Sequence, residues 1–181
     1  MSQLTVYRDD QPGKRVLQTR DFAEIRDALS DAGILLERWK AKAAIDDATE
    51  NDDIIAAYQH EIDKLVAERG YQTYDVVSMH PQHPDKDAFR QKFLAEHTHG
   101  EDEVRFFVRG QGLFIIHHND RVYSMLCEKD DLISVPAGTK HWFDMGPNPR
   151  FTAIRLFNNP EGWVANFTGD RIASRFPLLD N

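Results

Sequence analysis

The sequence lacks several features that would place it in a specialised class of protein. Among its 181 residues, Cys127 is the only cysteine, so no disulfide can form within the chain and a reducing compartment is expected. No apolar run is long enough to span a bilayer. The first residues also lack the basic and apolar segments of a secretory signal. These absences predict a cytoplasmic protein with no membrane partner.

Clusters of positive charge are also absent. The net charge is −8, and lysine and arginine are scattered along the chain. Such a surface repels phosphate backbones, so nucleic acid is not an expected partner. The chain has no repeats, low-complexity segments or long linkers, and its length fits one domain over residues 1–181.

The first part of this domain, about 1–90, is predicted to be rich in helices. Asp21 and Glu24 form a capping box before an apolar stripe that Gly33 ends. A second stripe follows Asp52 and Asp53 and stops at Gly70. A short third helix is predicted at 89–94, and strands are predicted at 34–39 and 74–79.

The region of about 90–160 has a different pattern of short strands and tight turns. Strands are predicted at 104–108, 113–117, 121–127, 132–135 and 151–157, with 141–143 following a Pro-Ala-Gly turn. The segment 109–112 contains two glycines and is expected to separate the first two strands. Short strands at this spacing predict an antiparallel barrel or sandwich.

The most informative segment begins at His97. Side chains alternate along a strand, so His97, His99 and Glu103 share one face if the segment is extended. His141, after the Pro136 turn, can complete the set across an antiparallel pair. Three imidazoles and one carboxylate would close a four-coordinate zinc site, whereas octahedral Fe²⁺, Ni²⁺, Co²⁺ or Mn²⁺ would keep two open positions. The set therefore predicts a catalytic metal.

The same alternation predicts two further inward side chains. Arg105 would direct a fixed positive charge toward the metal and favour an anionic substrate. Phe107 would line an apolar pocket, for which Trp142, Phe143 and Trp163 are further candidates. Cys127 is expected to be a buried small hydrophobe. The remaining histidines are expected to be ordinary polar residues: His60, His80, His83, His117 and His118.

The joint spacing resembles the two metal-binding motifs of the cupin superfamily, which is a family of small β-barrels. The motif runs His-x-His, three residues, Glu, six residues, Gly110, then Pro-x-Gly-x-x-His. Two positions depart from the common pattern, because Asp130 and Met145 stand where cupins often carry Gly and Asn. The fold class expected is thus mainly β, a cupin-type jelly roll with several helices, mostly in the N-terminal half.

Longer strings resemble the acireductone dioxygenase family in particular, and Met145 matches that family's own residue. The matching segments are 93–107 (FLAEHTHGEDEVRFF), 131–136 (DLISVP), 140–146 (KHWFDMG), 151–155 (FTAIR), 56–60 (AAYQH) and 161–163 (EGW). The resemblance implies that His97, His99, Glu103 and His141 bind one Fe²⁺ or Ni²⁺. It also implies that Arg105 favours the substrate dianion, and that Glu96 and Asp102 have accessory roles, in metal incorporation and in relaying local conformational change.

The substrate implied by the resemblance is 1,2-dihydroxy-3-keto-5-methylthiopentene, an acireductone of methionine salvage, with O₂ as co-substrate. The Fe²⁺ form would yield formate and 4-methylthio-2-oxobutanoate. The Ni²⁺ form would yield formate, carbon monoxide and 3-(methylthio)propanoate. A monomer is expected. Two alternatives stay open: another cupin enzyme, such as an isomerase or a different dioxygenase, and a ligand-binding cupin without catalysis.

Overall fold

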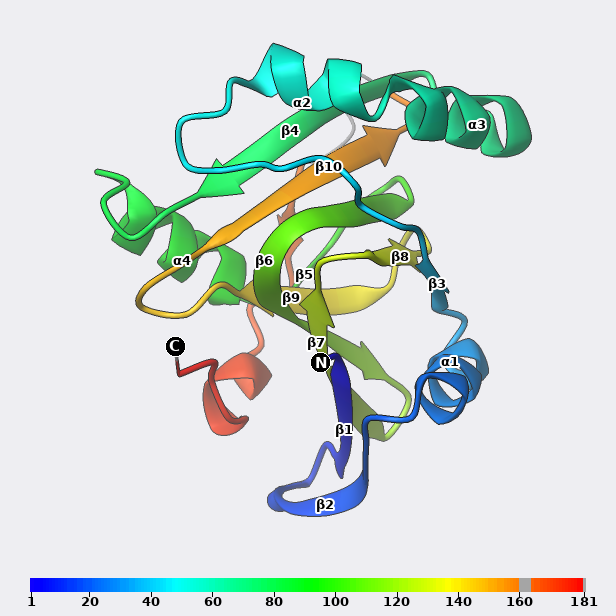
Figure 1. Ribbon diagram of the computed structural model, residues 1–181. Coiled ribbons are helices and arrows are strands. Elements are labelled where there is room, and N and C mark those ends of the chain that lie inside the picture. The colour runs from blue at the N-terminus through cyan, green and yellow to red at the C-terminus, as the bar shows by residue number, and fades with distance from the viewer. Residues whose placement is uncertain (160–163, 181) are drawn as a thin grey trace.

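The architecture is that of two antiparallel β-sheets that share one long bent strand. The computed structural model describes residues 1–159 and 164–180. The shared strand, β6 (Glu103–His118), curves through the centre of the molecule, and the helices lie on the outside (Figure 1). This confirms a mainly β fold. The strands of the described residues do not close into a complete ring.

Each sheet uses one half of β6. The first sheet has the order β11-β5-β9-β6-β7-β1-β2, and the second has the order β4-β10-β6-β8-β3. The strands of the first sheet are β1 (Gln3–Arg8), β2 (Gln11–Thr19), β5 (His97–Thr98), β7 (Arg121–Glu128), β9 (Lys140–Asp144) and β11 (Asn166–Phe167). Those of the second are β3 (Leu35–Arg38), β4 (Thr73–Met79), β8 (Asp131–Val135) and β10 (Phe151–Phe157). The sequence patterns did not predict β1 and β2.

The segment 109–112 bends β6 rather than ending it, so the prediction of two separate strands is wrong. Residues up to Gly110 pair with β10 or β8, and residues from Gln111 pair with β7 or β9. Gly110 has φ +68°, and a Cβ built on it would lie 1.8 Å from the carbonyl oxygen of Arg150. Only glycine fits there, because both the backbone conformation and the close approach exclude a side chain.

The helices cover the outer edges and faces of the sheets. They are α1 (Phe22–Asp31), α2 (Asn51–Ala57), α3 (Gln59–Arg69), α4 (Lys86–Leu94) and the 3₁₀ helix η1 (Ile172–Arg175). The capping prediction is confirmed, since the Asp21 carboxylate accepts a hydrogen bond from the amide of Glu24 at 2.9 Å. The single helix predicted between Asp53 and Gly70 is interrupted at Tyr58. None of the helices in the described ranges has the length and apolar character needed to cross a membrane.

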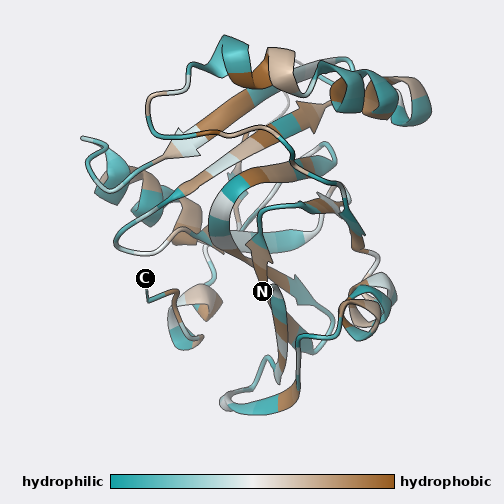
Figure 2. Cartoon of the chain, viewed as in Figure 1, coloured by the Kyte–Doolittle hydropathy of each residue, from teal (hydrophilic) through white to brown (hydrophobic). Residues whose placement is uncertain are grey.

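Three apolar clusters hold these layers together. The largest lies between the sheets and includes Phe107, Phe114 and the fully buried Cys127. A second joins Ile54 of α2, Ile62 and Leu65 of α3, and Tyr58 between these helices to the outer face of β6 and β10. A third lies under η1, on the outer face of the first sheet. Figure 2 shows this layering as hydrophobic strands beneath helices whose outer faces are hydrophilic.

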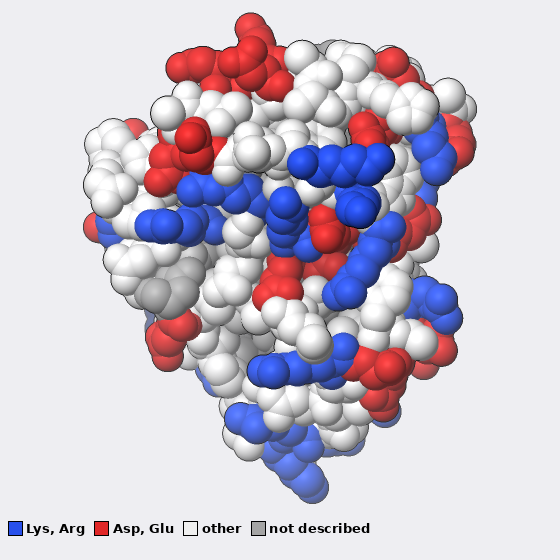
Figure 3. Space-filling model, viewed as in Figure 1, with Lys and Arg blue, Asp and Glu red and all other residues white. Residues whose placement is uncertain are grey.

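Basic side chains are concentrated in a band across one face, although the chain as a whole is acidic. In Figure 3 this band is interspersed with acidic side chains. Several of the molecule's cations form ion pairs, such as Arg109 with Asp47 at 2.6 Å and Arg69 with Glu37 at 2.7 Å. Paired charges of this kind contribute little net field.

Candidate metal centre

The four predicted ligands converge on one point inside the molecule. His97 lies on β5 directly opposite His141 on β9, Glu103 begins β6, and His99 follows β5. One ligand atom from each residue lies within 4.8 Å of the others, and all four residues are buried. The strand alternation and the antiparallel pairing thus bring together the set that the spacing predicted.

Hydrogen bonds to backbone carbonyls orient all three imidazoles. Nδ1 of His97 lies 2.7 Å from the carbonyl oxygen of Ala95. Nδ1 of His99 lies 3.2 Å from that of Val164, and Nδ1 of His141 lies 2.8 Å from that of Thr139. A carbonyl only accepts, so each Nδ1 carries the proton and each Nε2 presents a lone pair. This is the common support of metal-bound histidines.

The ligand atoms fit a bound cation. Oε2 of Glu103 lies 2.9 Å from Nε2 of His141 and 3.1 Å from Nε2 of His99. With the protons on Nδ1, two nitrogen lone pairs face a carboxylate oxygen, an arrangement that repels unless a positive charge lies among them. The donor set of three nitrogens and one oxygen suits Fe²⁺, Ni²⁺, Co²⁺ or Zn²⁺.

The ionisation of the site favours metal binding at neutral pH. Burial, opposed by the hydrogen bond to Ala95, lowers the pKa of His97 to about 4, so the imidazole is neutral. Burial alone would raise the pKa of Glu103, but the Arg105 cation holds that pKa well below its usual range. Metal ligands must be deprotonated, and these two are.

Arg105 is buried beside the metal centre, as predicted. Its Nε donates to Oε1 of Glu103 at 2.6 Å. Its guanidinium lies 4.7 Å from the ring centroid of Phe143 and 5.5 Å from that of Phe114. Burial lowers the Arg105 pKa while Glu103 opposes that shift, and a guanidinium stays protonated in proteins. Aromatic faces stabilise the cation further.

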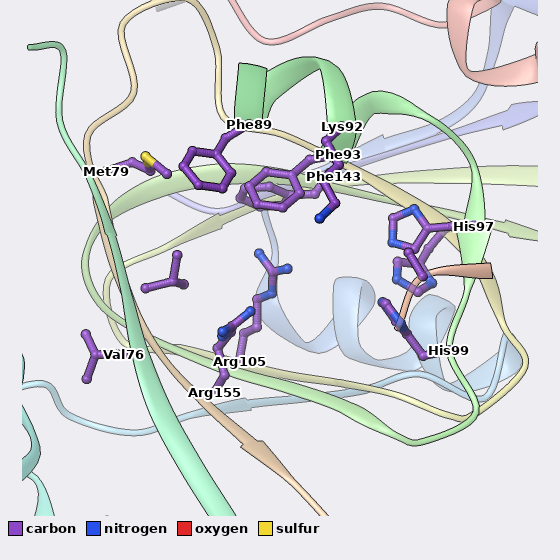
Figure 4. A pocket seen from close by; sticks show the side chains of 13 residues that line it. Val76, Met79, Phe89, Lys92, Phe93, His97, His99, Arg105, Phe143 and Arg155 are labelled. Carbon is purple, nitrogen blue, oxygen red and sulfur yellow. The ribbon is translucent and has the colours of Figure 1, made fainter. Parts of the chain in front are cut away.

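A cavity of about 310 Å³ opens onto the histidines. Its lining residues are Val76, Val77, Met79, Phe89, Lys92, Phe93, His97, His99, Arg105, His141, Phe143, Arg155 and Ala165. In Figure 4, Phe89 and Phe93 of α4 lie along the upper side, His97 and His99 lie at the right, and Lys92, Arg105 and Arg155 direct nitrogens inward. The cavity therefore combines an apolar wall, a potential metal and positive charge.

Sequence patterns identified only part of this lining. Phe143 lies at the cavity as proposed, but Phe107 and Trp142 do not line it. Phe107 packs behind Phe143, with centroids 6.5 Å apart, and Trp142 belongs to the cluster under η1. Trp163 lies outside the described residues. Phe89 and Phe93 were missed, although their spacing on a predicted helix places both on one face.

Two cations of the lining, Lys92 and Arg155, were also missed. Arg155 lies directly opposite Arg105 in the pairing of β10 with β6, and Asp75 of β4 pairs with its guanidinium. Only the strand register reveals this proximity, so no local pattern signals it.

Asp102 links the two metal-binding motifs. Its carboxylate accepts a hydrogen bond from the amide of Ala137 at 2.9 Å. The amide of Gly138, the residue after Ala137, donates a hydrogen bond to the carbonyl of His99 at 2.9 Å. Asp102 is therefore placed to fix the turn before His141 against the loop before Glu103.

Glu96 is fully buried but does not join the ligand set. Its Oε2 lies 2.8 Å from Nδ1 of His117, and its Oε1 accepts from the hydroxyl of Thr168 at 2.8 Å. His117 lies outside the ligand set, as expected, but it has a structural role that the sequence did not reveal, because it is one of two partners that satisfy this buried carboxylate.

The departure from the cupin pattern at Asp130 has a local explanation. Asp130 has φ +82°, so it adopts the conformation for which glycine is preferred. Its carboxylate accepts from the amide of Ala41 at 2.7 Å, and its amide donates to the carbonyl of Phe107 at 2.9 Å. These bonds offset the cost of the left-handed conformation, so the turn is preserved without glycine.

Comparison with known proteins places this geometry in a family. The model of the ARD/ARD′ family matches residues 3–165. An acireductone dioxygenase of Alcanivorax borkumensis is 61% identical over 178 residues, covering 98% of both chains. One from Yersinia enterocolitica is 58% identical over 180 residues, covering 99% of this chain and 100% of that protein.

A solved structure supports both the fold and the metal centre. It is described as acireductone dioxygenase from Bacillus anthracis with a cadmium ion in its active centre. It is 30% identical, covers 92% of this chain and 98% of its own, and superposes with a TM-score of 0.79. The cupin-type fold class is thereby confirmed, and the chain belongs to the ARD/ARD′ family of metal-binding dioxygenases.

Proposed function

We propose that this protein oxidises 1,2-dihydroxy-3-keto-5-methylthiopentene with O₂ in methionine salvage. The observation that carries the proposal is the position of Arg105. The guanidinium of Arg105 contacts the ligand Glu103 and lines the same cavity as three of the ligands. A metal site with an adjacent buried cation suits an anionic, oxygen-donating substrate such as an enediolate.

The metal would be one Fe²⁺ or Ni²⁺ held by His97, His99, Glu103 and His141, with two coordination positions left for substrate oxygens and Lewis-acid activation of the enediol. We propose that the Fe²⁺ form yields formate and 4-methylthio-2-oxobutanoate. The Ni²⁺ form would yield formate, carbon monoxide and 3-(methylthio)propanoate. The family relationship supports both outcomes, and metal supply would decide between them.

The chain's own residues would bind and ionise the substrate. Arg105 would stabilise the enediolate, because a fixed cation in a buried cavity lowers the pKa of a nearby acid. Phe89, Phe93 and Phe143 would receive the methylthio tail, since sulfur packs favourably against aromatic edges. Glu96 and Asp102 would assist catalysis through the conformation of the ligand-bearing segments rather than by contact with substrate.

The composition of the chain supports proposals about its location, its oligomeric state and its partners. We propose a cytoplasmic monomer whose partners are the acireductone and O₂, with neither nucleic acid nor membrane bound. The net charge of −8 supports the exclusion of nucleic acid.

The test is oxygen consumption by protein loaded with Fe²⁺ and mixed with anaerobically generated acireductone. Uptake well above spontaneous oxidation of the substrate, together with formate and the keto acid, is expected. Uptake equal to that of metal-free protein would contradict the proposal. The two alternatives give different results: an isomerase would consume its substrate without oxygen, and a ligand-binding cupin would bind metal without reacting with any enediol.

A further inference from the structure

The back of the strands that carry the candidate ligands holds a polar cluster in which the proposed reaction gives a role to Glu96 alone. His97 points into the barrel, so strand alternation directs the preceding Glu96 to the opposite, outer side. There it meets His117 from the second half of β6 and Thr168, which follows β11. These three side chains, from segments far apart in sequence, form what we name the outer latch.

The outer latch is well satisfied by hydrogen bonds. One carboxylate oxygen of Glu96 accepts a hydrogen bond from Nδ1 of His117 at 2.8 Å, and the other accepts one from the Thr168 hydroxyl at 2.8 Å. The Thr168 amide also donates to the Glu96 carbonyl at 3.1 Å. Nε2 of His117 lies 3.5 Å from Asp9, in the turn between β1 and β2. A buried carboxylate that loses one partner is costly, so the contacts hold together as a group.

The segment that the outer latch holds takes part in the metal centre. The Val164 carbonyl orients His99 through Nδ1 at 3.2 Å, and the ring of Phe167 lies 5.9 Å from that of His97. Ala165 lines the cavity. Yet β11 pairs with β5 over only two residues, a very short pairing for a strand. Contacts outside that pairing must therefore help to keep residues 164–168 in place.

We propose that the outer latch positions the segment 164–168, and through the Val164 carbonyl fixes the orientation of His99 as a ligand. Glu96, His117 and Thr168 are thus positioning residues for the metal, and none of them contacts the substrate cavity. The inference rests on the proposed occupancy of the metal site. Outer partners of ligating histidines change metal affinity by roughly 10- to 100-fold when removed.

The key variant is Thr168→Val, which removes the hydroxyl and keeps the shape. Thr168 is exposed, so this change does not disturb the core. Thr168→Ser restores the hydroxyl. Thr49→Val is the matched control, because Thr49 donates to the Asp46 carboxylate at 2.9 Å in a loop that no metal ligand contacts.

Three properties of each variant would be measured: Co²⁺ affinity by chelator competition, the visible spectrum of the Co²⁺ protein, and hydrogen exchange of the 164–168 amides. Thr168→Val should bind Co²⁺ about tenfold more weakly, with altered d–d bands and faster exchange. Thr168→Ser and Thr49→Val should match the wild type.

The inference would be overturned if Thr168→Val had the Co²⁺ affinity, the visible spectrum and the amide hydrogen exchange of the wild type. It would also be overturned if Thr168→Val bound Co²⁺ more weakly while the 164–168 amides exchanged at the wild-type rate, because the segment would then not have moved. His117→Gln serves as a second variant with the same expectations. Failure of the wild type to bind Co²⁺ would instead contradict the proposed metal site, so the two proposals fail in distinguishable ways.

Discussion

The two carboxylate oxygens of Glu103 have different partners, and Arg105 takes one of them. Oε1 accepts from Nε of Arg105 at 2.6 Å, whereas Oε2 faces His141 and His99 at 2.9 and 3.1 Å. The candidate ligand Glu103 and the cavity's buried cation therefore form one hydrogen-bonded unit. This unit couples the charge of the candidate metal centre to that of the cavity.

Removing the Arg105 cation should slow turnover while the metal stays bound. Arg105→Met keeps much of the side-chain volume but removes the charge, so oxygen uptake by the Fe²⁺ form should fall by roughly 10²- to 10³-fold. Metal content after dialysis should remain near one per chain. Arg105→Lys, which keeps a charge, should lose less. Normal turnover in Arg105→Met would exclude a role for the cation in ionising the substrate.

Changing Glu103 should instead abolish metal retention. Glu103→Gln replaces an anionic donor with a neutral amide and leaves the Arg105 charge buried without its partner. Metal affinity should fall by at least about 100-fold, as measured by elemental analysis after dialysis. Glu101→Gln, two residues away and partly exposed, makes the same chemical change outside the ligand set and should retain the metal. Equal metal content in both variants would remove Glu103 from the site.

The bend of β6 should depend on Gly110. A Cβ there would lie 1.8 Å from the Arg150 carbonyl oxygen, and φ is +68°. Gly110→Ala should lower the free energy of unfolding by about 3 kcal/mol or more, because strain and overpacking add. Urea unfolding would measure this. Gly13→Ala is the control, since a Cβ at Gly13 meets no atom within 4 Å. Similar stability losses in both variants would contradict the backbone clash.

Cys127 should make stability depend on alkaline pH. Burial raises the pKa of its thiol well above the usual value of 9.0, with Asp131 adding to the shift. Above pH 9 the unfolded chain loses this proton while the folded chain keeps it. The folded state is therefore destabilised by up to about 1.4 kcal/mol per pH unit.

The comparison between wild type and Cys127→Ala isolates this contribution. Below pH 9 the difference in unfolding free energy between the two proteins should be constant, and it should narrow as pH rises to 10. Urea unfolding at several pH values would measure the difference. A constant difference across the whole range would show that the thiol ionises in the folded protein. A thiol reagent should also leave native Cys127 unmodified, because its thiolate is not formed.

Local patterns were sufficient to predict several elements of the fold. The capping residue Asp21, the stop at Gly70 and most strands between Glu103 and Phe157 follow from short-range chemistry. Three features were missed or wrongly predicted. The short strand β1 and the edge strand β2 were missed, and β2 has few apolar residues in alternation. The predicted helix breaks at Tyr58, and β6 continues through its glycines because both of its halves find pairing partners in the folded chain.

By itself, the sequence determined which four residues form the candidate metal site. Alternation along a strand placed His97, His99 and Glu103 on one face, and the second motif supplied His141. Only the tertiary structure decided what surrounds them. Lys92 and Arg155 reach the cavity through helix docking and strand register, and the outer latch joins Glu96 to His117 and Thr168 across the sheet. Spacing within one strand is a local property, whereas contacts between segments depend on how the sheets pair and pack.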